Sequence, residues 1–316
     1  MAGNTSFDEL LSTTIANYRD QLTDNIFEAR PLTNYLMENG RIRMLDGGEK
    51  IVEPLIYGEN STVGSYSGYD TISLTAQTGI SAAEYEWKQY AASIAISGIE
   101  EAKNNGEAAI INLLEAKVMQ AEESMKEGFN AMFFGDGTGN TDKDWNGLGN
   151  IVEESGTVGG INLAPAGNEF WQSYVDDNGG VNVALSTADM TTAYNTVSVG
   201  NDHPDFIITT QTLFEKYESL LTPQLRYTDT KTADSGFQNL LFKAAPVTYD
   251  VDCTAGVMYF LNSKYLTLVG HSGKWFSQTD FVRPENLDAR YALIMCYGNL
   301  TCRNASKQGK LSSRTA

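Results

Sequence analysis

The sequence is poor in cysteine and histidine, and it has no long apolar run. Its 316 residues include 3 cysteines and 2 histidines. An odd number of cysteines without a C-x-x-C pair favours reduced thiols in a cytosolic compartment. The longest apolar run, YALIMCY at 291–297, is far shorter than the roughly 20 residues of a membrane-spanning helix. The N-terminus lacks the basic and apolar regions of a secretory signal peptide. We therefore expect neither a membrane segment nor secretion.

Basic side chains are also scarce, since 22 Lys and Arg stand against 40 Asp and Glu, a formal net charge of −18. Proteins that bind nucleic acid directly usually carry a basic stripe that displaces phosphate counterions. The basic cluster of this chain is confined to its C-terminal end and consists of Arg303, Lys307, Lys310 and Arg314. This balance excludes a free DNA-binding protein, and a hydrophobic content of 41% excludes a disordered chain.

The N-terminal quarter is predicted to form extensions. Apolar residues at helical spacing predict a short amphipathic helix over 5–22 and a second over Leu32–Met37. Ile51–Tyr57 predicts a strand, the glycine-rich segment Gly58–Gly68 a hairpin tip, and Tyr69–Leu74 the returning strand. Short helices and isolated hairpins are marginal in water. We therefore expect these segments to pack on a partner surface.

The next stretch predicts a strand and then a very long helix. Residues 84–97 alternate in polarity, but the phase shifts by one at Lys88–Gln89, which predicts a β-bulge. Residues 99–133 predict one helix, because apolar residues recur every three or four positions from Ile110 to Met132. A helix of this length would extend ~45 Å across the molecule.

A compact α/β unit is predicted from residue 186 onward. Ser186–Asp189 forms a capping box that opens a helix, and Gln211–Leu221 predicts a second helix. Short strands are predicted at Pro204–Thr210, Leu240–Phe242, Val257–Leu261, Tyr265–Val269 and Trp275–Phe276. The last strand covers 289–303 and is expected to be interrupted at Gly298.

Candidate catalytic side chains are few. Ser272 and His203 could form a nucleophile pair, but the Gly-His-Ser-Gly sequence around Ser272 is not the G-x-S-x-G elbow of hydrolases. Cys296 and Cys302 fall on one face of the last strand with no histidine nearby. We therefore expect them to be buried thiols and not zinc ligands.

One loop is rich in oxygen ligands, with Asp136, Asn140, Asp142 and Asp144 at near-alternate spacing. It resembles a calcium loop only loosely, because the required glycine is Thr141 and the required glutamate is Gly147. The alternate glycines 135, 137 and 139 follow a helix and not a strand, which does not support a phosphate loop. We predict no catalytic residue, no cofactor and no metal site, and hence a structural subunit that completes itself on its neighbours.

The order of these segments resembles the major capsid proteins of tailed bacteriophages, which have the HK97-type fold. Asn25–Glu38, Gly40–Gly48 and Glu53–Asn60 resemble the N-terminal arm leading into the extended two-stranded E-loop. Glu84–Lys88, Ile94–Glu101 and the long helix resemble the P-domain with its spine helix. The resemblance to an A-domain segment rests on Gly236–Lys243 and Ala245–Val247. The resemblance to the closing P-domain strand and tail rests on Tyr297–Thr301, Arg303, Asn304 and Gln308–Gly309.

The resemblance implies an α+β fold in five parts. These are an N-terminal arm at 1–45, the E-loop hairpin at 46–80, the P-domain with the spine helix at 81–160, a mixed α/β A-domain at 161–285, and a closing strand with a tail at 286–316 that returns to the P-domain.

The resemblance also implies a function. The chain would self-assemble into hexamers and pentamers of an icosahedral phage head, built in the host cytoplasm and enclosing double-stranded DNA without specific binding. Its partners would be other copies of itself and portal and scaffold proteins. Members of this family often carry an N-terminal scaffolding segment, so we expect that it was removed or is a separate protein.

The E-loop is the expected intersubunit contact. Glu53, Glu59 and Asp70 could meet Arg303 or Lys307 of an adjacent subunit, because the two segments have opposite charge. The best-known family member forms a Lys–Asn cross-link from this loop, but Gly58–Gly68 contains no lysine. We therefore predict non-covalent locking.

Three alternatives stay open. An encapsulin-like nanocompartment shares the fold and would be distinguished by a cargo partner. A soluble metal-dependent hydrolase could use the Asp136–Asp144 loop or Ser272 and His203. A tail or baseplate protein would form rings or tubes instead of closed shells.

Overall fold

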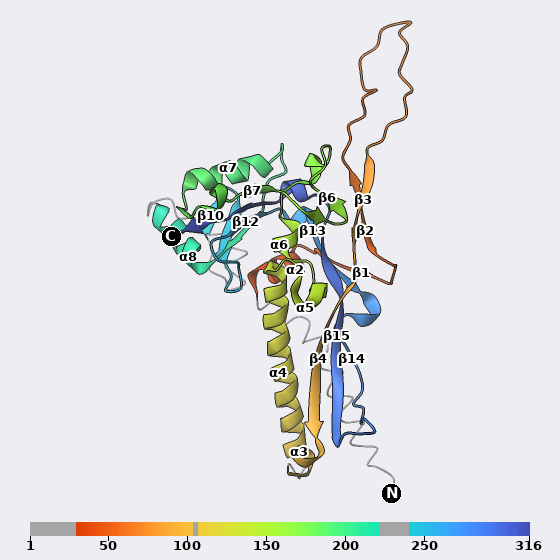
Figure 1. Ribbon diagram of the computed structural model, residues 1–316, viewed down its shortest axis with the longest axis vertical. Helices are drawn as coiled ribbons and strands as arrows, with labels where there is room; N and C mark the ends of the chain where they lie inside the picture. The colour runs from red at the N-terminus through yellow and green to blue at the C-terminus, as the bar shows by residue number, and fades with distance from the viewer. Residues whose placement is uncertain (1–29, 104–106, 222–239) are drawn as a thin grey trace.

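The long strand β15 (Ala289–Cys302) is the centre of the first sheet. The computed structural model describes residues 30–103, 107–221 and 240–316, and Figure 1 shows β15 running along the length of the body. On one side β15 pairs antiparallel with β4 (Lys88–Ser97) over the whole of β4. On its other side it pairs with β14 (Ser277–Gln278) and then with β13 (Leu266–His271). The strand β1 (Ile42–Leu45) closes this edge, parallel to β13.

The predicted interruption of the last strand at Gly298 is wrong, because β15 continues through it to Cys302. Gly298 is the position where β15 is paired with both Lys88 of β4 and Gly270 of β13. A Cβ at Gly298 would lie 2.2 Å from the Val269 carbonyl oxygen and 2.7 Å from the Trp145 ring. The glycine is therefore a site of close packing and not a break in the strand.

The long helix α4 (Glu107–Phe134) lies alongside β4 and β15 (Figure 1). The helix predicted over 99–133 corresponds to α3 (Gly98–Lys103) and α4, and the three residues between them lie outside the described ranges. At 1.5 Å per residue α4 is ~42 Å long. Buried apolar side chains of its described part recur three or four apart at Val118, Ala121, Met125, Phe129 and Phe133, and Phe134 is buried as well. The sequence predicted this spacing, but with Met132 as its last member instead of Phe133.

A second, six-stranded sheet forms the other half of the body, in the order β10-β11-β9-β12-β16-β7. Its strands are β7 (Tyr174–Asp176), β9 (Phe206–Thr209), β10 (Leu240–Phe242), β11 (Ala245–Tyr249), β12 (Met258–Leu261) and β16 (Gly309–Leu311). Helices α7 (Thr187–Val197) and α8 (Gln211–Leu220) pack on it. The predicted cap of α7 is confirmed, because the Ser186 hydroxyl accepts a hydrogen bond from the Asp189 amide.

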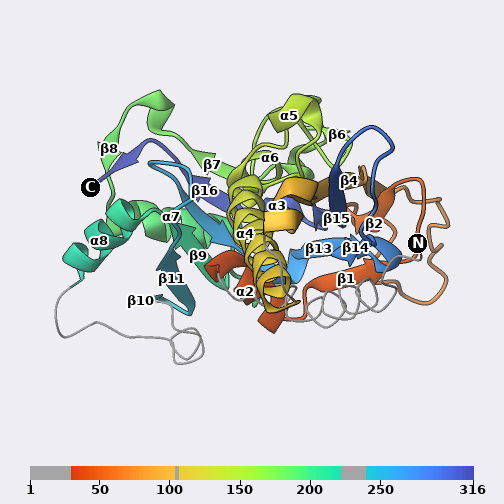
Figure 2. The same cartoon turned by 90° about the horizontal axis from the view of Figure 1, so that it is seen from below.

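Alternate residues of the second sheet point to two different cores. Ile207 and Met258 pack with α7 and α8, whereas Ile208 and Tyr259 join the larger core around α4 and β15. Figure 2 shows α4 end-on, between the second sheet and the first. The larger of the two cores contains residues of both sheets and therefore joins them.

The smaller elements connect these units. Among the described residues they are the helices α2 (Pro31–Glu38), α5 (Gly139–Asp142) and α6 (Leu148–Ile151), the strand pairs β5 (Thr157–Val158) with β6 (Ile161–Asn162) and β8 (Val183–Ala184) with β17 (Arg314–Thr315), and 3₁₀ turns at 169–171, 178–180, 263–265, 272–274 and 305–307. The predicted helix at Leu32–Met37 is confirmed by α2, whereas the one predicted over 5–22 lies outside the described residues.

The hairpin projects from the body as a separate two-stranded sheet (Figure 1). Its strands β2 (Ile51–Ile56) and β3 (Ile80–Tyr85) pair antiparallel. The predicted returning strand at Tyr69–Leu74 is wrong, because no strand forms between residues 57 and 79. The predicted bulge is also wrong: β3 ends at Tyr85 and β4 begins at Lys88, so the phase shift marks a change of sheet.

The C-terminal segment crosses from one sheet to the other. After β15 in the first sheet, β16 inserts between β12 and β7 of the second sheet, and β17 pairs with β8. The guanidinium of Arg314 is buried and bonds to Asp176 at 2.6 Å. The segment 286–316 was expected to return to the P-domain. Its first part, β15, lies in the first sheet, whereas β16 lies in the second sheet and β17 pairs with β8. No helix within the described ranges is long and apolar enough to cross a membrane.

Candidate interaction surface

The hairpin has two parts with different surroundings. We call β2 and β3 the hairpin root, and residues 57–79 the hairpin tip. In the root, alternate side chains of β2 face inward, and Ile51 and Leu55 are buried together with Ala83 and Tyr85 of β3. The tip has no regular secondary structure and almost all of its residues are exposed.

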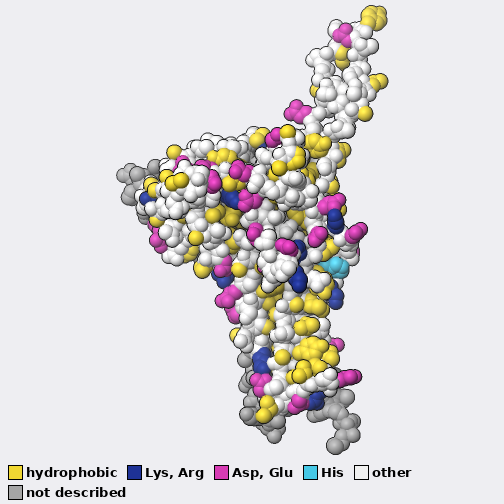
Figure 3. Space-filling view, in the orientation of Figure 1, with side chains coloured by type: hydrophobic (Ala, Val, Ile, Leu, Met, Phe, Trp, Pro, Cys, Tyr) yellow, Lys and Arg dark blue, Asp and Glu magenta, His cyan; other side chains and the backbone are white. Residues whose placement is uncertain are grey.

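Large apolar side chains are exposed along the hairpin more than in any other segment of comparable length that the structure describes. They are Val52, Ile56, Tyr57, Val63, Tyr66, Tyr69, Ile72, Leu74 and Ile80. Leu74 keeps 94% of its surface in contact with solvent and Val63 84%. In Figure 3 these apolar atoms lie along the projecting hairpin, away from the body. In the figure the yellow atoms are scattered among white ones along the hairpin. A projecting segment with this many exposed large apolar side chains is a candidate for a protein–protein contact.

The charges on the hairpin tip are all negative. The tip contains Glu59 and Asp70 and neither lysine nor arginine, and no basic atoms are visible on it in Figure 3. Both acids are exposed, and Asp70 accepts a hydrogen bond from the Ser67 amide at 2.8 Å. A complementary partner surface would combine apolar area with positive charge.

Glu53 lies in the root and is fully buried. Its carboxylate pairs with Arg43 of β1, and with Arg303 at 2.8 Å. The structure thus brings together Glu53 and Arg303 within one chain, although the sequence suggested contacts between subunits. Lys307 is half-buried. It makes a small contribution to the lowered pKa of Asp202, which is held down mainly by hydrogen bonds from Tyr265 and Lys264.

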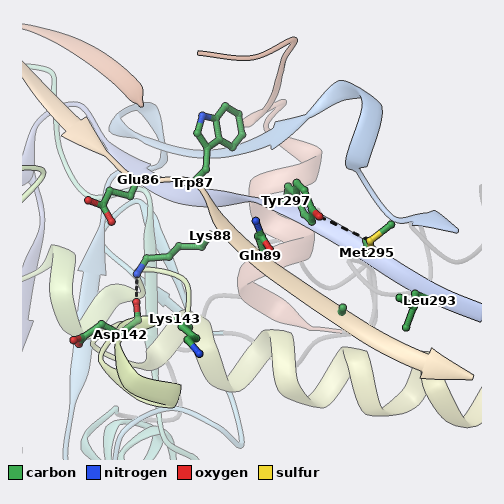
Figure 4. A pocket seen from close by; sticks show the side chains of 10 residues that line it. Glu86, Trp87, Lys88, Gln89, Asp142, Lys143, Leu293, Met295 and Tyr297 are labelled. Carbon is green, nitrogen blue, oxygen red and sulfur yellow. Dashed lines mark hydrogen bonds between the residues drawn. The ribbon is translucent and has the colours of Figure 1, made fainter. Parts of the chain in front are cut away.

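A groove of 570 Å³ opens on the first sheet beside α5. Figure 4 shows Trp87, Lys88, Met295 and Tyr297 lining it, together with Lys143 from the loop after α4. Lys88 donates a hydrogen bond to the Asp142 carbonyl oxygen. The groove combines apolar and charged side chains but contains no nucleophile with an adjacent base. The sequence pointed separately to the phase shift at Lys88 and to Asp142 of the oxygen-rich loop, but it gave no sign that the fold brings them together.

The structure does not bring Ser272 and His203 together. The Ser272 hydroxyl donates to Asp46 at 2.7 Å. The His203 ring stacks on Tyr194, and its Nδ1 lies 3.2 Å from the Pro204 carbonyl oxygen. Each side chain thus has other partners, and the nucleophile pair considered from the sequence is not formed.

The oxygen-rich loop is engaged in its own turn. Asp136 accepts hydrogen bonds from the amide and hydroxyl of Thr138, which lower the pKa of Asp136. Asn140 donates to Asp144 at 2.7 Å. Within the described residues, no group of three or more His, Cys, Asp or Glu side chains could hold a metal ion.

All three cysteines are buried and free. Burial raises the pKa of the Cys302 thiol to about 12 and raises the pKa of Cys253 and Cys296 as well. Cys302 lies at the end of β15, where its backbone contacts Tyr85 of the hairpin root. These thiols are therefore protonated near neutral pH and belong to the core.

Known proteins resemble this chain in structure. No family model and no curated sequence matches it. Among solved structures, the capsid protein of cyanophage A-1(L) is similar, with 17% identity, a TM-score of 0.66, and coverage of 88% of this chain and 91% of that chain. The capsid protein of a native GTA particle gives 11% identity and a TM-score of 0.58, covering 89% and 90%. The SrpI encapsulin of Synechococcus elongatus has 11% sequence identity and a TM-score of 0.56, with coverage of 89% of this chain and 88% of that chain.

These similarities extend over nearly the whole chain in each case. The protein thus has the fold that phage capsid proteins and an encapsulin share, with mixed α/β content. This is the HK97-type fold that the order of the sequence segments indicated.

Proposed function

We propose that the chain is a structural subunit that assembles with copies of itself into hexamers and pentamers of an icosahedral phage head. The observation that supports this most is the hairpin tip, a long segment whose apolar and acidic side chains are mostly exposed in the described part of the chain, apart from Tyr57 at its base, whose ring stacks on Phe170. On an HK97-type fold, such a segment is well suited to contact a neighbouring subunit. We propose accordingly that the protein is not an enzyme.

The proposed parts of the subunit follow from the fold. The hairpin of β2 and β3 with its tip would be the E-loop, and α4 the spine helix of a P-domain that contains β4 and β15. The second sheet with α7 and α8 would form the A-domain. Two of the boundaries expected from the sequence, at 80 and 285, would shift under this proposal. The hairpin extends to Tyr85, the strands β13 and β14 before residue 285 pair with β15 of the P-domain sheet, and β16 after residue 285 pairs within the A-domain sheet.

The contact between subunits would be largely apolar. Burying a large apolar side chain contributes ~1.5–3 kcal/mol, whereas an exposed ion pair contributes ~0–1 kcal/mol. Glu59 and Asp70 would add charge complementarity towards Lys307 of a neighbour. Glu53 and Arg303 already pair within the subunit, so we assign them to its internal structure.

Further partners belong to the same proposal. A portal protein, a scaffold protein and packaged double-stranded DNA would accompany the shell in a virion assembled in the host cytoplasm. The net charge of −18 favours weak contact between the wall and the DNA. Locking would be non-covalent, because the tip contains no lysine.

An encapsulin-like nanocompartment is a second candidate, because the SrpI encapsulin has a TM-score of 0.56 with this chain. Its shell would load a protein cargo instead of a genome. Shells purified from the native source would contain DNA in the first case and a stoichiometric protein in the second.

The test is sedimentation and negative-stain microscopy of the expressed chain, alone and with its scaffold. Closed shells or rings of five and six subunits are the expected result. A chain that stays monomeric in every condition would refute the shell function and return attention to the hydrolase alternative.

A further inference from the structure

Glu53 breaks the polarity pattern of its strand. Three residues of β2 face inward, and Glu53 stands between the apolar Ile51 and Leu55. Its side chain has no exposed surface. Removing a carboxylate from water is costly unless the charge is paired and hydrogen-bonded. An acidic residue at this position therefore requires specific partners.

The partners of Glu53 come from two distant segments of the body. Oε1 pairs with Arg43 of β1, and Oε2 accepts a hydrogen bond from Nε of Arg303 at 2.8 Å, just beyond the end of β15. The Thr301 hydroxyl lies 3.4 Å from Oε1 and donates to the Thr267 carbonyl oxygen at 3.0 Å. The carboxylate thus connects the hairpin root to both β1 and the end of β15.

In the described part of the chain, few other directional contacts hold the hairpin to the body, and one of them is the stacking of Tyr57 on Phe170, with ring centroids 4.5 Å apart. The strands β2 and β3 pair with each other and with neither large sheet. The Tyr85 hydroxyl donates to the Cys302 carbonyl and accepts from the Cys302 amide. The Glu84 amide donates to the Gly159 carbonyl at 2.8 Å. Glu53 and Tyr85 therefore reach the same short stretch of chain, residues 301–303.

We propose that Glu53 is a positioning residue that sets the direction in which the hairpin leaves the body. Apolar contacts in the root are non-directional, and they allow the two strands to tilt. A carboxylate held through both oxygens by two arginines on different segments has a defined geometry. Because the direction of the tip would decide which surface of a neighbour it meets, this inference rests on the proposed shell function.

A role in stability alone makes a different prediction. Replacing a buried ion cluster as a whole by apolar residues is often neutral or stabilising. In this cluster Glu53 is buried, while the side chains of Arg43 and Arg303 are partly exposed. The triple variant Arg43→Met, Glu53→Met and Arg303→Met should therefore melt close to the temperature of the parent. If Glu53 positions the hairpin, this stable variant should still lose its defined direction.

The experiment measures that direction in the unassembled full chain. Spin labels are placed on cysteines introduced at Ser65 in the tip and Thr192 on α7, both exposed, while the native cysteines are buried. We expect a narrow distance distribution in the parent and loss of that narrow distribution in Glu53→Gln and in the triple variant. The control is Glu84→Gln, which removes the half-exposed pair with Lys50 from the same hairpin and should leave the distribution narrow.

The outcomes separate the two proposals. Narrow distributions in both Glu53 variants would overturn the positioning role. Broad distributions with an unchanged yield of closed shells would show that the direction does not matter for assembly, and would overturn the inference as stated. A parent that never forms shells would refute the shell function, while the distance measurement would still test Glu53.

Discussion

The root and the tip belong to one hairpin, but their apolar and acidic side chains have different surroundings. In the root, β2 alternates between buried and exposed residues, and its buried acid is paired with two arginines of the same chain. In the tip, the apolar side chains are exposed and the acids meet no basic partner in the described part of the chain. The inward face of the root is complete in one subunit, whereas its outward face, with Val52, Ile56 and Ile80 exposed, and the tip have the composition of a surface that another subunit completes.

The first prediction removes the apolar surface of the tip. We expect the variant Tyr66→Ser, Tyr69→Ser and Leu74→Ser to lose shell assembly, since each side chain would otherwise bury surface contributing ~1.5–3 kcal/mol. Its subunit stability should stay within ~0.5 kcal/mol of the parent, as for exposed sites in general. Sedimentation measures shell assembly, and urea unfolding measures the stability of the subunit. Normal shells from this variant would remove the tip from the interface.

The second prediction disrupts the root. Tyr85 is buried and its hydroxyl makes two hydrogen bonds to Cys302. We expect Tyr85→Ala to destabilise the subunit by ~3–5 kcal/mol, as for large-to-small changes of aromatic residues in a core. Tyr85→Phe keeps the ring and should cost ~1–3 kcal/mol, because a buried backbone amide and carbonyl lose their partner. Urea unfolding of the subunit measures both, and equal losses in the two variants would contradict the role of the ring.

The third prediction compares two glycines, one against the root and one in the tip. A Cβ at Gly159 would lie 2.8 Å from the Cβ of Ala83, and the backbone has φ of +56°. Gly64 has no atom within 4 Å of such a Cβ. We expect Gly159→Ala to lower subunit stability by ~1–3 kcal/mol and Gly64→Ala to leave it unchanged. Thermal unfolding of the two variants side by side measures the difference, and a neutral Gly159→Ala would refute the close packing.

The sequence predicted most elements whose partners lie within the chain. The spacing in the described part of α4, the cap of α7 and the buried strands of the second sheet all reflect burial in one subunit. These signals are local, because periodicity and capping depend on residues a few positions apart. The strand β2 was predicted as well, from the apolar pairs Ile51-Val52 and Leu55-Ile56 at its two ends.

The sequence did not predict features that depend on distant pairing. Glu53 has one partner ten positions away and another far along the chain at Arg303, so its charge suggested a surface residue. Gly298 suggested a break, although close packing of Trp145 explains it. The apolar residues at 69–74 suggested a strand, but no neighbouring strand is available to pair with them. Each error arose where a neighbour in space, and not in sequence, decides the structure.

The smallest predicted effect concerns the charge of the tip. Glu59 is exposed and would meet Lys307 of an adjacent subunit, a pair contributing ~0–1 kcal/mol at each contact. We expect Glu59→Lys to leave the subunit unchanged and to lower the melting temperature of assembled shells slightly. The difference should shrink as salt is raised, because screening weakens exposed pairs. Glu59→Gln is the matched control, since it removes the attraction without adding repulsion. Shells of Glu59→Lys that assemble and melt like the parent at low salt would exclude Glu59 from the contact and leave the apolar side chains as its basis.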